Sequence, residues 1–142
     1  MNSKMRNTLF LIAAFAAVLT SCHESLEKRA QREAQEYTAK SCPTPWFNGT
    51  RTDSVVFDIP TLTFITYSSL NGKIDNADII NANRQHILDG LIADEKGNTA
   101  HVVYHEAGYS FKHVLRSSAD PRKVLFQCTI TPKDYGKGGA RK

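Results

Sequence analysis

Hydrophobic and polar residues alternate with different periods along this chain, and the changes of period predict its elements. Residues 23–40 contain no Gly or Pro, and apolar side chains recur at steps of three and four, at Leu26, Ala30, Ala34 and Tyr37. This spacing is typical of an amphipathic helix. We expect a solvated helix that tethers the following domain. A flexible linker is the alternative, because the apolar stripe is narrow.

Two segments with a period of two predict strands. The first covers residues 54–57 and 62–67 with Pro60 between its halves, and the second covers 109–115 and 124–130, joined by 117–122. Alternating β-branched and aromatic residues are typical of strands, and a proline between two such runs favours a turn. Each segment is therefore expected to form an antiparallel hairpin, and a break in an edge strand at Pro60 is the alternative for the first.

Helical spacing separates the two hairpins. Asp75 or Asn76 can begin a helix over residues 76–93, and its expected apolar face includes the long stem of Arg84. Residues 98–107 are ambiguous between strand and helix, and their spacing favours a short helix ending at Gly108. We expect an α+β fold: an antiparallel four-stranded sheet of two hairpins with a helix on one face, preceded by the N-terminal helical tether.

The first residues follow the pattern of an export signal. Lys4 and Arg6 precede an apolar run over residues 8–19 that is too short to cross a bilayer. The run ends in Leu19-Thr20-Ser21-Cys22, which resembles the lipobox of bacterial lipoproteins. The resemblance implies cleavage before Cys22, acylation of that cysteine with chains such as palmitate, and a place in the cell envelope.

The same resemblance, to small lipoproteins of Gram-negative bacteria, favours the outer membrane, with the protein facing the periplasm or the cell surface. The expected organisation is a signal peptide at 1–21, a helical tether at 22–41, one α+β domain at 42–135 and a disordered tail at 136–142. The length after the signal allows a single domain with a modest core.

Two cysteines remain once Cys22 is assigned to the lipid. In an oxidising compartment an even number favours a Cys42–Cys128 disulfide, and two free buried thiols are the alternative. Trp46 and Phe47 lie close to Cys42 in a segment broken by prolines and a glycine. We expect them to cap the core, and an exposed aromatic binding patch is the alternative.

Charge and motifs exclude several classes of function. The chain carries 18 Lys and Arg against 14 Asp and Glu, interspersed rather than gathered in a basic stripe, which argues against nucleic-acid binding. It has no nucleophile elbow, phosphate-binding loop or dinucleotide fingerprint. Asp53-Ser54-Val55 resembles a bacterial O-glycosylation acceptor, although it also fits the start of a strand.

His101 and His105 have the spacing of one helical turn, and Glu106 follows them. Histidines at this spacing can share a metal ion, but the order differs from the zinc-protease motif and the sequence indicates no third ligand, with His113 only a remote candidate. We expect both rings to lie near solvent, and we expect no metal and no cofactor.

These observations favour a non-enzymatic binding or interaction module, held at a membrane through its acyl anchor. Its partner is expected to be an envelope protein or a glycan, bound by a sheet face, an open strand edge or the loop around Trp46. An inhibitor-like protein acting on a secreted enzyme is one alternative. A small hydrolase is another, and a cleft lined by converging His, Asp and Glu would favour it.

Overall fold

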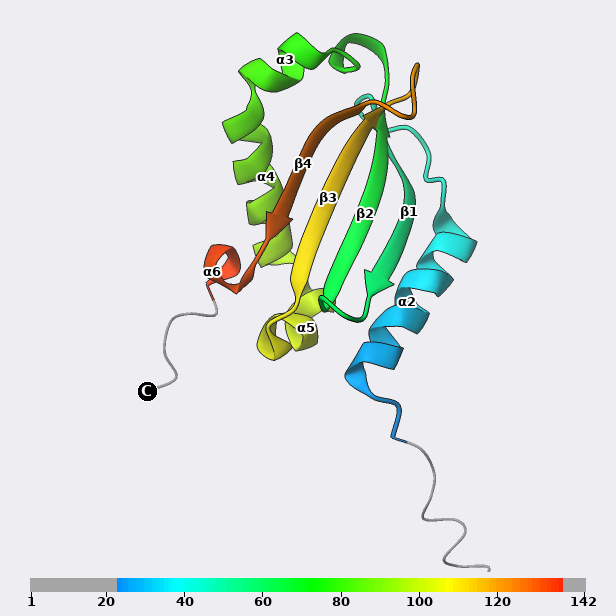
Figure 1. The fold of residues 1–142 in the computed structure, drawn as a ribbon, viewed down its shortest axis with the longest axis vertical. Coiled ribbons are helices and arrows are strands. Elements are labelled where there is room, and N and C mark those ends of the chain that lie inside the picture. Colours follow the sequence, from blue (N-terminus) through cyan, green and yellow to red (C-terminus); the bar gives the residue numbers. More distant parts are fainter. Residues whose placement is uncertain (1–22, 137–142) are drawn as a thin grey trace, which may run out of the picture.

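The computed structural model describes residues 23–136, so the predicted signal peptide and Cys22 lie outside the described residues, as does the tail after Gly136. Figure 1 shows one sheet with α2 beside β1 and α4 beside β4. In chain order the elements are α2 (Leu26–Ser41), β1 (Thr50–Asp58), β2 (Thr63–Leu70), the 3₁₀ turn η1 (Gly72–Ile74), α3 (Ala77–Ala82), α4 (Arg84–Gly97), η2 (Thr99–His101), α5 (Val102–Ala107), β3 (Ser110–Ser117), β4 (Val124–Ile130) and α6 (Pro132–Tyr135). Within residues 23–136, no helix has the length and hydropathy needed to cross a membrane.

The sheet is mixed, with the strand order β1-β2-β3-β4. Both predicted hairpins are confirmed, because β1 pairs with β2 and β3 pairs with β4 in antiparallel fashion. The expectation of a wholly antiparallel sheet is wrong, since β2 and β3 are parallel. The reason is the crossover: α3, α4 and α5 return the chain along the sheet, so β3 begins at the same end as β2.

The helix expected over 76–93 is divided at Asn83 into α3 and α4. Asn76 begins α3 as predicted, and its side chain accepts hydrogen bonds from the backbone N–H groups of Asp78 and Ile79. At the break, the Asn83 amide donates to the carbonyl of Ile79, a local contact that competes with a continuous helix. The short helix predicted before Gly108 is confirmed as η2 and α5.

The N-terminal helix exists, but it is part of the folded domain and not a solvated tether. Ala30 and Ala34 are 0% and 2% exposed and belong to the core. The hydroxyl of Thr38 accepts from the backbone N–H of Val55 and donates to its carbonyl, both at 2.8 Å. The small alanines allow α2 to approach β1 closely, and Thr38 then satisfies polar groups on the edge of that strand.

Two apolar clusters form the core. The first contains Phe57, Phe64, Phe111 and Tyr104. The second, at the other end of the strands, contains Leu70, Ile80, Leu115, Leu125 and Phe126. The large side chains are therefore concentrated toward the two ends of the sheet, and the middle of the helix-bearing face is left to smaller ones.

Candidate functional site

A groove lies on the helix-bearing face of the sheet, between α2 and α4, and we call it the α2–α4 groove. It consists of two adjoining hollows with volumes of about 570 and 490 Å³. The residues that line both hollows are Thr52, Thr66, Leu91 and His113. The hollows therefore form one continuous feature along the strands.

Small hydroxyl side chains explain why this groove is hollow. Its floor includes Thr52 of β1, Thr66 and Ser68 of β2, and His113 of β3, which are neighbours through the strand pairing. Because alternate residues of a strand point to opposite faces, these side chains continue the face that carries Phe64 and Phe111. Beyond Phe64 and Phe111 this face carries Thr and Ser, whose side chains are too short to fill the space between α2 and α4.

The groove is acidic, in contrast to the net positive charge of the chain. Glu33, Asp94 and Glu95 line it, and no described Lys or Arg does. Burial would raise the pKa of Glu33, but hydrogen bonds from Tyr104 and Arg29 outweigh it and keep the pKa below its ordinary value. Burial lowers the pKa of His113, which favours a neutral ring on the floor.

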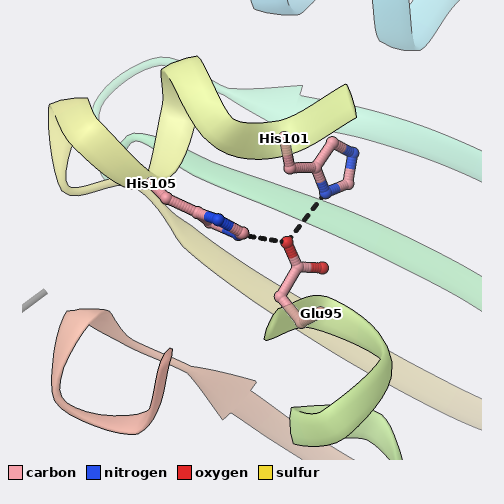
Figure 2. Close-up of side chains that lie close together, drawn as sticks. All are labelled: Glu95, His101 and His105. Carbon is pink, nitrogen blue, oxygen red and sulfur yellow. Dashed lines mark hydrogen bonds and ion pairs between the residues drawn. The ribbon is translucent and has the colours of Figure 1, made fainter. Parts of the chain in front are cut away.

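At one end of the groove, three side chains converge. Figure 2 shows Glu95 from the last turn of α4 between the rings of His101 and His105. Its Oε1 atom lies 2.8 Å from Nδ1 of His101 and 2.6 Å from Nε2 of His105. Glu95 is 6% exposed, and it is the only carboxylate among the buried side chains of residues 23–136. We call these three residues the Glu95 cluster.

Aromatic packing fixes both rings of the Glu95 cluster. His101 stacks on Phe111 with ring centroids 4.8 Å apart, and His105 stacks on Tyr135 at 4.4 Å. Tyr135 is itself held by a hydrogen bond from its hydroxyl to the carbonyl of Tyr109. Burial would raise the pKa of Glu95, but its contacts with the two histidines outweigh it, so its pKa lies below its ordinary value.

The sequence identified the two histidines but not their partner. Neither ring is freely exposed, since His101 is 29% and His105 15% accessible, so the expectation of solvent-facing rings is wrong. Glu106, the carboxylate singled out by the motif, is exposed, and His113 lies on the groove floor. The sequence signal for Glu95 is the Gly97-Asn98 pair after it, which ends α4 and returns the chain toward the same carboxylate.

The predicted aromatic cap is also wrong. Trp46 and Phe47 are 41% and 76% exposed, beside a turn at Asn48 and Gly49 that pairs Phe47 with Thr50. The guanidinium of Arg51 lies 4.7 Å from the centre of the Trp46 ring. The alternative, an exposed aromatic patch, describes this segment better.

The structure does not contain the expected Cys42–Cys128 disulfide, and both cysteines are free thiols. Cys42 follows α2 beside β1, whereas Cys128 lies in β4 at the other edge of the sheet. Three strand spacings separate these edges by about 14 Å, too far for a bond that requires Cα atoms within about 7 Å. The oxidising compartment and the even number of remaining cysteines suggested the bond, but neither carries information about strand order.

Ser54 lies within β1, as the strand interpretation of that segment expected.

Three solved structures share this fold at low sequence identity. A putative secreted protein from Pseudomonas aeruginosa has a TM-score of 0.66 and 12% identity, covering 79% of this chain and 98% of its own. The pilotin EpsS of the Vibrio vulnificus type 2 secretion system has a TM-score of 0.59 and 14% identity, covering 78% and 91%. The type II secretion system pilotin AspS of Vibrio cholerae has a TM-score of 0.55 and 14% identity, covering 77% and 91%. At these identities the likeness establishes the fold alone.

Sequence comparison assigns a family. A search of curated proteins finds no match to the chain. Residues 25–126, which run from the residue before α2 into β4, match a family of domains of unknown function. The matched region contains α2, both walls of the groove and the whole Glu95 cluster. The chain therefore belongs to the family described as domain of unknown function DUF8479.

Proposed function

We propose that this protein is a non-enzymatic interaction module of the bacterial cell envelope, and that its α2–α4 groove binds a basic, amphipathic helix of a partner protein. The groove is the observation that carries the proposal. Its floor spans β1 to β3, a width of about 10 Å at ordinary strand spacing, which matches the diameter of about 10 Å of an α-helix. A partner helix between α2 and α4 would complete the helical layer on this face of the sheet.

The chemistry of the groove favours the same occupant. Exposed apolar side chains line each hollow, Tyr37 of α2 in the larger one and Ile79 of α3 in the smaller one. Glu33 and Asp94 add negative charge. An apolar helix face bearing Lys or Arg would bury its hydrophobic side against the walls and meet opposite charge at the rim.

Similarity to secretion-system pilotins supports this class of function over catalysis. Two of the related folds are pilotins of type 2 secretion systems. By analogy of fold, we infer that this protein assists an envelope assembly and does not transform a substrate. The binding site in this inference is the groove of the protein itself. No residue role is transferred from the pilotins, because their sequence identity to this chain is too low.

The anchor is a second part of the proposal. We infer that Cys22 carries acyl chains that hold the domain at the outer membrane, since the lipobox-like Leu19-Thr20-Ser21 precedes it. Two or more chains give stable anchoring where one gives marginal binding. Mass spectrometry of the native protein should show an acylated N-terminal Cys22, and Cys22→Ala should block processing. Cleavage at another position without acyl mass would contradict the anchor.

The groove can be tested by site-specific photo-crosslinking in cells. A crosslinking residue at Tyr37 should give one discrete adduct with an envelope protein, joined through an apolar, basic segment. The same residue at Val56, exposed on the opposite face of the sheet, should give none. Thr66→Phe would fill the groove and should abolish the Tyr37 adduct. Thr129→Phe, a matched change at an exposed strand position outside the groove, should preserve it.

Two outcomes would contradict this proposal. One is adducts from Val56 as strong as those from Tyr37. The other is a Tyr37 adduct that Thr66→Phe leaves intact although the variant is folded, as judged by circular dichroism.

A small hydrolase is the second candidate, because the Glu95 cluster brings a carboxylate and two imidazoles to one end of the groove. The cluster lacks a nucleophile, and the carboxylate is already occupied by both rings. Turnover of ester or peptide substrates that Glu95→Gln abolishes, and that Glu106→Gln preserves, would favour this function over the interaction module.

A further inference from the structure

We propose that Glu95, His101 and His105 form a Zn²⁺ site with three protein ligands at the end of the α2–α4 groove. The sequence alone argued against a metal here because no third ligand was apparent and the rings were expected to face water. The structure removes both premises. It supplies Glu95 from α4 and partly buries both rings.

The donor set suits zinc. One carboxylate oxygen, Nδ1 of His101 and Nε2 of His105 all lie within 4.8 Å of one another. Two imidazole nitrogens and one carboxylate oxygen are ligands that zinc takes in sites that keep a fourth position open. Bound tetrahedrally at about 2.0–2.1 Å, these atoms would be about 3.4 Å apart. The contacts of 2.8 and 2.6 Å therefore need to open by less than about 1 Å, which small side-chain rotations supply.

The ligands are held before the ion binds. Phe111 and Tyr135 stack on the two rings, and Glu95 extends from a helix. A ligand set that is already fixed loses little conformational entropy when a metal binds. The site therefore has the rigidity that a loose surface pair of histidines lacks.

Hydrogen bonding around His101 leaves a place for a cation. The side-chain oxygen of Asn98 accepts from the backbone N–H of Ala100, so its amide nitrogen is the group that faces Nδ1 of His101, at 3.1 Å. Oε1 of Glu95 lies 2.8 Å from the same ring nitrogen. Nδ1 cannot accept from Asn98 and donate to Glu95 at the same time. In the tautomer in which Nδ1 accepts from Asn98, a cation between this nitrogen and the carboxylate would satisfy both acceptors.

The fourth position of the ion would be reachable from the groove. Glu95 and His101 both line the larger hollow. An ion on them would accept a water molecule, or a donor atom from whatever occupies the groove. The site would also join the end of α4 to α5, so metal binding should stabilise the fold.

Zinc titration of the native protein, purified without chelators, tests the proposal. We expect one Zn²⁺ per chain by isothermal titration and elemental analysis, and a rise in melting temperature on addition of the ion. Glu95→Gln and His105→Gln should each weaken zinc affinity at least about 10-fold, the range already seen when outer partners of metal ligands are lost. The matched controls are Glu106→Gln and His23→Gln, at exposed positions outside the cluster, and they should bind zinc as the native protein does.

A measurement on the unchanged protein covers the case in which a variant fails to fold. Zinc should shift the imidazole NMR signals of His101 and His105 and leave those of His23 in place. Absence of stoichiometric binding, or binding that Glu95→Gln and His105→Gln leave unchanged, would overturn the proposal. Thr66→Phe, which tests the groove, should leave zinc binding intact, so failure of one proposal is distinguishable from failure of the other.

Discussion

Replacing Thr38 by Val tests whether α2 is an integral part of the domain. The change keeps the shape of the side chain and removes the hydroxyl that bonds both the N–H and the C=O of Val55. A hydrogen bond contributes about 1 kcal/mol, and a buried group left without a partner costs about 1–3 kcal/mol. Because both contacts are part-buried, we expect a loss of about 2 kcal/mol in the free energy of unfolding.

Urea denaturation followed by circular dichroism measures this loss. For a slope of about 1.5 kcal/mol/M, the midpoint should fall by about 1.3 M. Thr129→Val is the matched control, an exposed threonine on β4 for which no side-chain hydrogen bond is found within residues 23–136, and it should shift the midpoint by less than about 0.3 M. A Thr38→Val midpoint equal to that of the control would refute the reasoning, because α2 would then be dispensable to the edge of β1.

Three further predictions follow from the same packing. Ala30→Leu should destabilise the fold by about 1–3 kcal/mol, because Ala30 is 0% exposed in the core and lines neither hollow of the groove, and a native-like thermal melt would contradict this. Tyr104→Phe should cost about 1.5–3 kcal/mol in urea, since it removes a bond of 2.6 Å to the charged Glu33 from a fully buried ring. Burial raises the pKa of both Cys42 and Cys128, so both thiols should react slowly with iodoacetamide at pH 7 in the folded protein. Both should react fully after denaturation without reductant, and failure to label the denatured protein would show that they are bonded.

Local periodicity in the sequence predicted most elements but not how they pair. The alternation around Val124 to Ile130 and the capping by Asn76 depend on neighbouring residues, and both were found where expected. The parallel pairing of β2 with β3 depends on the direction in which three helices return the chain, and a period says nothing about that direction. The disulfide prediction failed for the same reason, because strand order decides the distance between Cys42 and Cys128.

The interpretation of α2 failed for a different reason. The narrow apolar stripe of Leu26, Ala30, Ala34 and Tyr37 predicts a weakly amphipathic, solvated helix. In the structure, Ala30 and Ala34 are small because the backbone of β1 lies close to the helix. A helix with a stripe of small residues can be a solvated tether, or it can pack tightly against a strand. Only the position of the neighbouring strand distinguishes the two.

The candidate site was half visible in the sequence. The spacing of His101 and His105 indicated that two histidines lie one helical turn apart. Glu95 lies in the polar last turn of α4, and apart from the Gly97-Asn98 pair that follows it, nothing local marks this carboxylate as buried. Likewise the groove arises where Thr66 and Thr52 replace larger side chains, and the sequence shows this only once the strands are in register.

The packing of α2 has a consequence for how the protein would be placed at a bilayer. If Cys22 carries the acyl chains, only residues 23–25 separate it from the first turn of a helix that is fixed to the sheet. Three extended residues reach about 10 Å, so the N-terminal end of α2 would stay within about that distance of the lipid. Because α2 forms one wall of the groove, the anchor would set how far the groove lies from the membrane surface, and a partner held in the same membrane would have to reach the groove at that height.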